Sequence, residues 1–187
     1  MQVLCIVRRF PRLGTTPGSA RISLWTTHFG ASEGGRLGPM DDNQLKQPDQ
    51  MRPIHTQRDL EDHWRALMGP LGFARRQLWL GFLAVDRMMT PLLLQLEDLP
   101  EWPDDLGLDG LMMIAEQTLD EQLPGGRLAV LLCRPGPARM TAGDLAWARG
   151  LTSAARRNSI PLEPVHLAND ERLQAFAPDD LAERRSA

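Results

Sequence analysis

The chain has 187 residues, of which 42% are hydrophobic and 24% charged, and this composition is ordinary for a globular domain with its own hydrophobic core. Its formal net charge is -3, so no basic surplus is available for binding nucleic acid through phosphate groups. Residues 1–50 hold six Lys or Arg and four Asp or Glu, whereas residues 51–187 hold fifteen and twenty, so the part expected to fold is the acidic part.

Single residue types exclude further classes of site. Lys46 is the only lysine, so residues 51–187 offer no lysine for a Schiff base or for a phosphate-binding loop. The two cysteines, Cys5 and Cys133, form no CxxC pair, which excludes a disulfide framework and a thiolate metal site. No apolar run reaches the roughly 20 residues of a membrane span, and Arg8 and Arg9 follow the short VLCIV run instead of preceding it. We therefore expect a cytoplasmic protein without a membrane partner.

Residues 1–50 are rich in Gly, Pro, Ser and Thr and show no sustained hydrophobic period. This composition predicts a disordered N-terminal extension, or a segment that precedes the true start codon, with Met40 and Met51 as alternative starts. Within it, RISLWTTHF at residues 21–29 is able to form one short strand. Residues 51–75 are predicted to contain an N-terminal helix, because apolar side chains recur there at helical spacing between Leu60 and Leu71. Thr56 is the predicted N-cap of that helix.

Residues 76–178 are predicted to form an α/β domain. QLWLGFLAVD and TPLLLQLEDL are strands joined by a short turn and are therefore antiparallel. DGLMMIAEQTLDEQL is a helix, and RLAVLLC at 127–133 is a buried strand. A helix follows from Thr141 to Asn158, with Thr141 and Asp144 in a capping box. LEPVHLA and RLQAFA are the last strands, and residues 179–187 form a solvated tail. The fold class is α/β, with a mixed β-sheet flanked by about three helices.

The stretch LLCRPGPARMTAGD runs from an apolar strand through a loop rich in Pro and Gly to a helix start. It resembles the RadC-like branch of the JAB/MPN (JAMM) metalloprotease-like family. In that family a strand ends in His-x-His-Pro and a loop leads to Ser-x-x-Asp, the two His and the Asp hold zinc, and an upstream Glu activates water. SIPL at 159–162 and VHL at 165–167 resemble the family's next strand, so the likeness covers residues 77–177, about 100 residues. The resemblance implies a layered, cytidine-deaminase-like architecture and a link to DNA repair.

The chain departs from that motif at its metal ligands. Leu132 and Arg134 stand where the family has histidine, Thr141 stands for Ser, and only Pro135 and Asp144 match. A hydrolytic zinc site needs about three protein ligands and an open position for water, and arginine has no lone pair to give. We therefore expect a metal-free, non-catalytic domain that holds no zinc and no other cofactor.

Two further expectations concern charged groups near this motif. Arg134 and Asp144 are expected to pair with each other where the metal would lie. Glu97 and Glu116 are candidates for the family's water-activating glutamate, but by position only. The basic doublets Arg75-Arg76 and Arg156-Arg157 have no aromatic residues between them, and we expect both to be solvated.

An alternative function is a hydrolase of isopeptidase or protease type that uses Asp144 and His166, with Cys133 as an additional candidate. Thr141 is a further candidate catalytic residue. A cysteine beside a histidine can act as a nucleophile, and Arg134 is a cation able to lower the pKa of the Cys133 thiol. Against this, the flanking LLC sequence predicts that Cys133 is a buried strand residue, and His166 is expected to pack beside a helix.

Trp102 is the candidate interaction residue. It lies between two prolines in the acidic loop PEWPDD and is expected to be exposed, whereas Trp79 and Trp147 are expected in the core. Exposed aromatic residues anchor protein interfaces, although Trp102 in this loop is equally suited to cover a sheet edge. The sequence therefore predicts a protein-interaction or scaffold module whose protein partner it does not identify.

Overall fold

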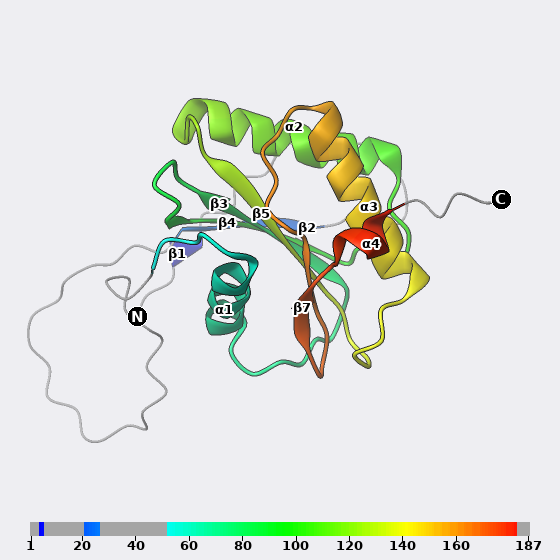
Figure 1. Cartoon of the computed structure of the whole chain (residues 1–187). Coiled ribbons are helices and arrows are strands. Elements are labelled where there is room, and N and C mark those ends of the chain that lie inside the picture. Colours follow the sequence, from blue (N-terminus) through cyan, green and yellow to red (C-terminus); the bar gives the residue numbers. More distant parts are fainter. Residues whose placement is uncertain (1–3, 6–20, 27–51, 183–187) are drawn as a thin grey trace, which may run out of the picture.

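The computed structural model describes residues 4–5, 21–26 and 52–182, and it shows a mixed β-sheet with helices on both faces (Figure 1). The strand order is β1-β2-β4-β3-β5-β6-β7, and the five strands β3 to β7 lie within residues 52–182. The strands are β1 Leu4–Cys5, β2 Arg21–Thr26, β3 Gln77–Leu83, β4 Met89–Glu97, β5 Arg127–Cys133, β6 His166–Ala168 and β7 Leu173–Ala175. The helices are α1 Gln57–Met68, α2 Asp105–Gln122, α3 Ala142–Arg157 and α4 Pro178–Leu181. The predicted α/β class with a mixed sheet is confirmed.

Strand directions follow from the length of each connection. The short turn after β3 makes β4 antiparallel to it, and β5 is antiparallel to β3 on the other side. Helix α3 connects β5 to β6, and these two strands are parallel, as a helical crossover allows. Strand β7 returns antiparallel to β6. Because β3 and β5 run in opposite directions, the start of β3 lies beside the end of β5.

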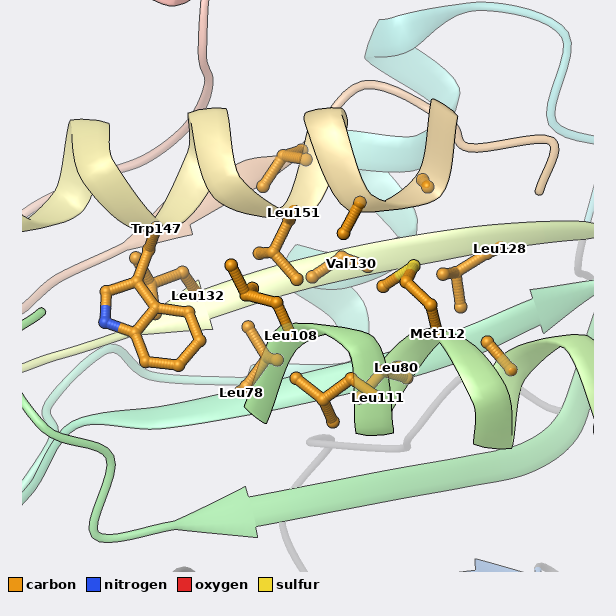
Figure 2. Packing of buried hydrophobic residues seen from close by; sticks show 14 of the residues in the cluster. Leu78, Leu80, Leu108, Leu111, Met112, Leu128, Val130, Leu132, Trp147 and Leu151 are labelled. Carbon is orange, nitrogen blue, oxygen red and sulfur yellow. The ribbon is translucent and has the colours of Figure 1, made fainter. Parts of the chain in front are cut away.

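Helices α2 and α3 cover one face of the sheet and α1 covers the other (Figure 1). Figure 2 shows the first of these two cores, in which leucines from β3 and β5 meet the inner sides of α2 and α3. The buried face of α2 is the one that its helical spacing predicts: Leu108, Leu111, Met112, Ala115 and Leu119. On the opposite face, Leu60 and Trp64 of α1 pack on alternate residues of the same strands, including Leu131 and Cys133 of β5.

The predicted capping box of α3 is present, and the predicted N-cap Thr56 of α1 also belongs to a capping box. Thr56 accepts a hydrogen bond from the N–H of Asp59 at the start of α1, and the Asp59 carboxylate accepts one from the N–H of Thr56. Thr141 and Asp144 make the same reciprocal pair at the start of α3. Each box satisfies N–H groups that the first helical turn leaves without a partner.

The sheet extends further toward the N-terminus than the predicted domain boundary. Residues 21–26 form strand β2, in the segment whose sequence allows a strand, and β2 pairs antiparallel with β4 along its length. Pairing with β2 satisfies the backbone groups on the outer side of β4, which would otherwise be an open edge. Leu4–Cys5 form strand β1, which pairs antiparallel with β2, and the other residues of 1–50 lie outside the described part of the chain.

Three details differ from the sequence prediction. The strand expected at 162–168 is reduced to His166–Ala168, with one isolated bridge between Leu128 and Leu162, because Pro161 and Pro164 have no N–H to donate. Trp79 is only partly buried, whereas Trp147 is buried in the core as expected. The tail begins with the short helix α4, whose Leu181 packs against the core, and residues 183–187 lie outside the described residues.

Candidate functional site

The segment that carries the family resemblance lies at the end of β5, where several loops meet. Register pairs Cys133 of β5 with Gln77 of β3, so Arg134 and Arg76 are neighbours one residue beyond this pair. The loop after Arg134 leads to Thr141, the N-cap of α3, and α3 presents Asp144 in its first turn. Two arginines and one aspartate are thus brought together by the sheet register and by a helix cap.

Asp144 is fully buried, and both of its carboxylate oxygens are engaged. Its Oδ1 accepts from Nη1 of Arg76 at 2.9 Å and from Nε of Arg134 at 3.0 Å. Its Oδ2 accepts from Nε of Arg134 at 2.8 Å and from the backbone N–H of Thr141 at 2.8 Å. The predicted Arg134–Asp144 pair is therefore confirmed, with Arg76 as a second cation.

These contacts set the charge state of the carboxyl group. Burial by itself raises the pKa of Asp144, but the N–H of Thr141 and the guanidinium groups of Arg134 and Arg76 outweigh it. The pKa lies below the ordinary value of 3.8, so the group is ionised at neutral pH. A buried carboxylate needs such partners, because an ionised group without one in the interior is costly.

Arg134 uses the rest of its guanidinium group to hold the loop that follows it. Nη1 donates to the carbonyl oxygens of Pro135 at 3.0 Å and Pro137 at 3.3 Å, and Nη2 donates to that of Arg139 at 2.7 Å. The side chain is only 6% exposed. The guanidinium group of Arg134 therefore donates hydrogen bonds to one carboxylate and to three backbone carbonyl oxygens.

The same loop is also held from the turn between β6 and β7. Asp170 accepts from the N–H of Gly136 at 2.6 Å and from the N–H of Phe73 at 2.9 Å, and Glu171 accepts from the N–H of Ala138 at 3.0 Å. The N–H groups of Gly136 and Phe73 hold the pKa of Asp170 below its ordinary value. Gly136 has a φ of 99°, a conformation that favours glycine. The loop is thus fixed on both sides.

Sequence reasoning missed two buried charges. Arg76 was expected to be solvated, but its side chain is only 14% exposed because it reaches Asp144 from the start of β3. Glu163 lies near the other end of β5 and is 8% exposed. It accepts from Nη1 of Arg87 at 2.8 Å and from Nε of Arg127. A doublet of arginines gives no sequence signal for which member turns inward, since that depends on strand register.

The residues of the hydrolase alternative do not converge. Leu132, like Arg134 two residues later, belongs to the α2/α3 side of β5, whereas Cys133 belongs to the α1 side. His166 aligns with Leu131 and so also lies on the α1 side of the sheet, away from Asp144. Its Nδ1 lies 2.8 Å from the carbonyl oxygen of Pro164. Within residues 52–182, no hydrogen bond joins Cys133 to His166.

The chemistry of these two groups also disfavours catalysis. Cys133 is fully buried, and burial raises the pKa of its thiol far above the ordinary value, so the thiolate is disfavoured. Burial lowers the pKa of His166, outweighing the opposite effect of the backbone of Pro164 and Gln57, and the imidazole is therefore neutral at pH 7. Both are packing residues of the α1 side.

The remaining candidates lie apart from Asp144. Glu97, at the end of β4, is 3.9 Å from Nη1 of Arg75, and Glu116 is exposed on the outer side of α2. Neither forms a hydrogen bond or an ion pair with Asp144, so neither is placed to activate water there. Trp102 is 53% exposed in the loop before α2, as the sequence predicts.

The donor set around Asp144 does not fit zinc. Its neighbours are two guanidinium groups, and no cluster of three or more His, Cys, Asp or Glu side chains able to hold a metal occurs in the described part of the chain. A divalent cation here would have to displace a buried cation that already carries the compensating charge.

Comparisons with known proteins add no assignment. Neither the family models, nor the curated proteins, nor the solved structures give a match to this chain. Among residues 4–5, 21–26 and 52–182, no helix is long and apolar enough to cross a membrane.

Proposed function

We propose that the chain is a metal-free, non-catalytic domain of the RadC-like JAB/MPN type and that it works as a protein-interaction or scaffold module in the cytoplasm. The observation that carries this proposal is the position of the Arg134 guanidinium group, at the place where the family's zinc ion would lie. It lies against the one motif carboxylate, Asp144, and binds the loop carbonyls as a metal ion would bind oxygen ligands.

The geometry supports the resemblance in one further respect. Leu132 and Arg134 are alternate residues at the end of β5, and Asp144 meets the strand end from α3 on the same side of the sheet. Two imidazoles at positions 132 and 134 would therefore lie on the same side of the sheet as Asp144. A His-x-His and Asp zinc site needs its three ligands on one side of the sheet, so this arrangement supports the resemblance.

The same geometry argues against catalysis at this site. Asp144 has no exposed surface and its oxygens are occupied, so no water or substrate group reaches it. The link to DNA repair that the resemblance implies stays a prediction, and the acidic charge of residues 51–187 lends it no support.

Metal analysis of the purified full-length chain tests the proposal. We expect far less than one zinc per chain and no change in melting temperature when a chelator is added, because Arg134 already neutralises Asp144. Near-stoichiometric zinc, together with a fall in melting temperature after chelation, would contradict it.

A gain-of-function variant tests the resemblance separately. The double substitution Leu132→His and Arg134→His restores the motif's imidazoles beside Asp144, and we expect the folded variant to melt at a higher temperature in the presence of zinc. The matched control carries Asp144→Asn as well and should lose that response. A folded double variant that ignores zinc would count against the proposed family.

A further inference from the structure

The outer side of α2 carries exposed apolar side chains. Within residues 52–182 four large hydrophobic residues are strongly exposed, and three of them lie between positions 102 and 113: Trp102 at 53%, Leu106 at 84% and Met113 at 58%. Leu106 and Met113 are seven residues apart, close to two helical turns, so they share one face of α2. We call Leu106 and Met113 the α2 apolar stripe, and Trp102 lies in the loop that precedes α2.

This stripe lies in the most acidic part of the chain. Residues 97–126 contain nine Asp or Glu and no Lys or Arg. On α2, Asp109, Glu116 and Asp120 repeat at helical spacing beside the stripe, and all three are exposed. Asp109 pairs with Arg157 of α3 at 2.8 Å, while Glu116 and Asp120 form no ion pair within the described residues. The stripe therefore has an acidic border that is only partly neutralised.

We propose that the outer side of α2 binds a basic amphipathic helix of a protein partner. This inference rests on the proposed function as an interaction module and names the surface and the chemistry of the partner. Apolar side chains of the partner would contact Leu106 and Met113, and arginine or lysine beside them would face Glu116 and Asp120. Trp102, at the N-terminal end of α2, would close one end of the contact.

Shape and charge together select this class of partner. Leu106 and Met113 lie two turns apart on one face of α2, and this spacing fits a second helix packed alongside, because helices pack at roughly 8–10 Å through residues spaced in this way. The negative charge repels the phosphates of nucleic acid and of anionic lipid headgroups. Exposed apolar side chains supply hydrophobic contacts to a partner. The acidic residues beside them favour a partner that carries positive charge.

A defined peptide tests the proposal with the full-length chain. The probe is a fluorescently labelled synthetic helix of about 18 residues, with leucine at helical spacing and arginine flanking it. A second peptide with glutamate in place of every arginine is the charge control. Fluorescence anisotropy should show binding of the basic peptide, weakening as salt rises, and no binding of the acidic one.

Substitutions then locate the binding site. Leu106→Ala with Met113→Ala should weaken binding about tenfold or more, because both side chains are exposed anchors. Val85→Ala removes a side chain that is 75% exposed in the β3–β4 turn and should leave binding unchanged. Glu116→Gln with Asp120→Asn should weaken binding and flatten its salt dependence. Glu61→Gln with Asp62→Asn removes the same charge from α1, on the other face of the sheet, and should have no effect.

Three outcomes would overturn the proposal: absence of binding, equal binding of the acidic peptide, or equal effects of the α1 and α2 charge variants. A concentration-dependent dimer that Leu106→Ala with Met113→Ala abolishes would assign this surface to a second copy and would also overturn it. The zinc measurement is independent of these results. If the chain holds no zinc and does not bind the peptide, only the proposed α2 binding surface is refuted. If the chain holds zinc and binds the peptide, only the proposed metal-free function is refuted.

Discussion

Nε of Arg134 lies 2.8 Å from Oδ2 of Asp144, and neither side chain is more than 6% exposed. The pair links the end of β5 to the first turn of α3, and Arg76 adds a third member from the start of β3. A buried pair of this kind is weak evidence of net stabilisation, because both groups lose their hydration. Removing one member is nevertheless costly, and the first prediction concerns that asymmetry.

Arg134→Ala should lower the free energy of unfolding by about 3–5 kcal/mol, because it leaves Asp144 with one cation and removes the donor for three loop carbonyls. Urea denaturation of both proteins measures the change. Arg75→Ala is the control, since Arg75 pairs with Asp98 at the exposed surface and its loss should cost about 1 kcal/mol or less. Equal losses in the two variants would show that the buried arginine does no more than a surface one.

Acid should destabilise the protein through Asp144. The pKa of Asp144 is lowered in the folded state, so this group contributes stability above its unfolded pKa, near 3.8, and loses it as the pH falls through the folded pKa. The free energy of unfolding should therefore fall steeply below about pH 4. Asp144→Asn should be less stable at neutral pH and should show a shallower fall in acid. A variant whose curve runs parallel to that of the parent would contradict this assignment.

A second pH effect should appear nearer neutrality. Burial lowers the pKa of His166 below 6.5. Just below pH 6.5 the imidazole is therefore protonated in the unfolded chain but still neutral in the folded protein. Stability should therefore be complete above about pH 6.5 and should decline as the pH falls toward the folded pKa, by up to about 1.4 kcal/mol per pH unit. Burial lowers the pKa of His63 as well, so this residue acts in the same direction.

Replacing the buried imidazole separates these two contributions. His166→Gln should reduce the slope of unfolding free energy against pH between about pH 6.5 and about pH 5, and adding His63→Gln should reduce it further. Denaturation at several pH values within that range gives the slope. An unchanged slope in the His166 variant would mean that the pKa of His166 is the same in the folded and unfolded states.

Local patterns predict most of this fold because they depend on neighbours in the sequence. The helix of Thr141 and Asp144 has its capping box in four consecutive residues, and the buried face of α2 follows from helical spacing. Even the Arg134–Asp144 pair could be predicted, since both residues belong to one strand-loop-helix segment.

What the sequence does not reveal depends on register between distant strands. Arg76 turns inward because β3 aligns Gln77 with Cys133, a pairing that no local pattern shows. Alternation along β5 likewise decides that Cys133 lies on the α1 side while Leu132 lies on the α3 side. The sequence allows Cys133, His166 and Asp144 to cooperate in a hydrolase, but the sheet separates Asp144 on the α3 side from Cys133 and His166 on the α1 side.

The last prediction concerns the thiol of Cys133. A buried thiol with a raised pKa should react with a thiol reagent only when the protein opens. In a Cys5→Ser chain, where Cys133 is the only cysteine, we expect the native protein to react slower than the urea-unfolded protein by on the order of a thousandfold or more. The ratio should shrink in Arg134→Ala, because lower stability raises the open fraction. A catalytic cysteine would behave in the opposite way and react faster in the native protein at neutral pH, with a rate that depends on His166. Fast native labelling that His166→Gln abolishes would therefore restore the hydrolase alternative.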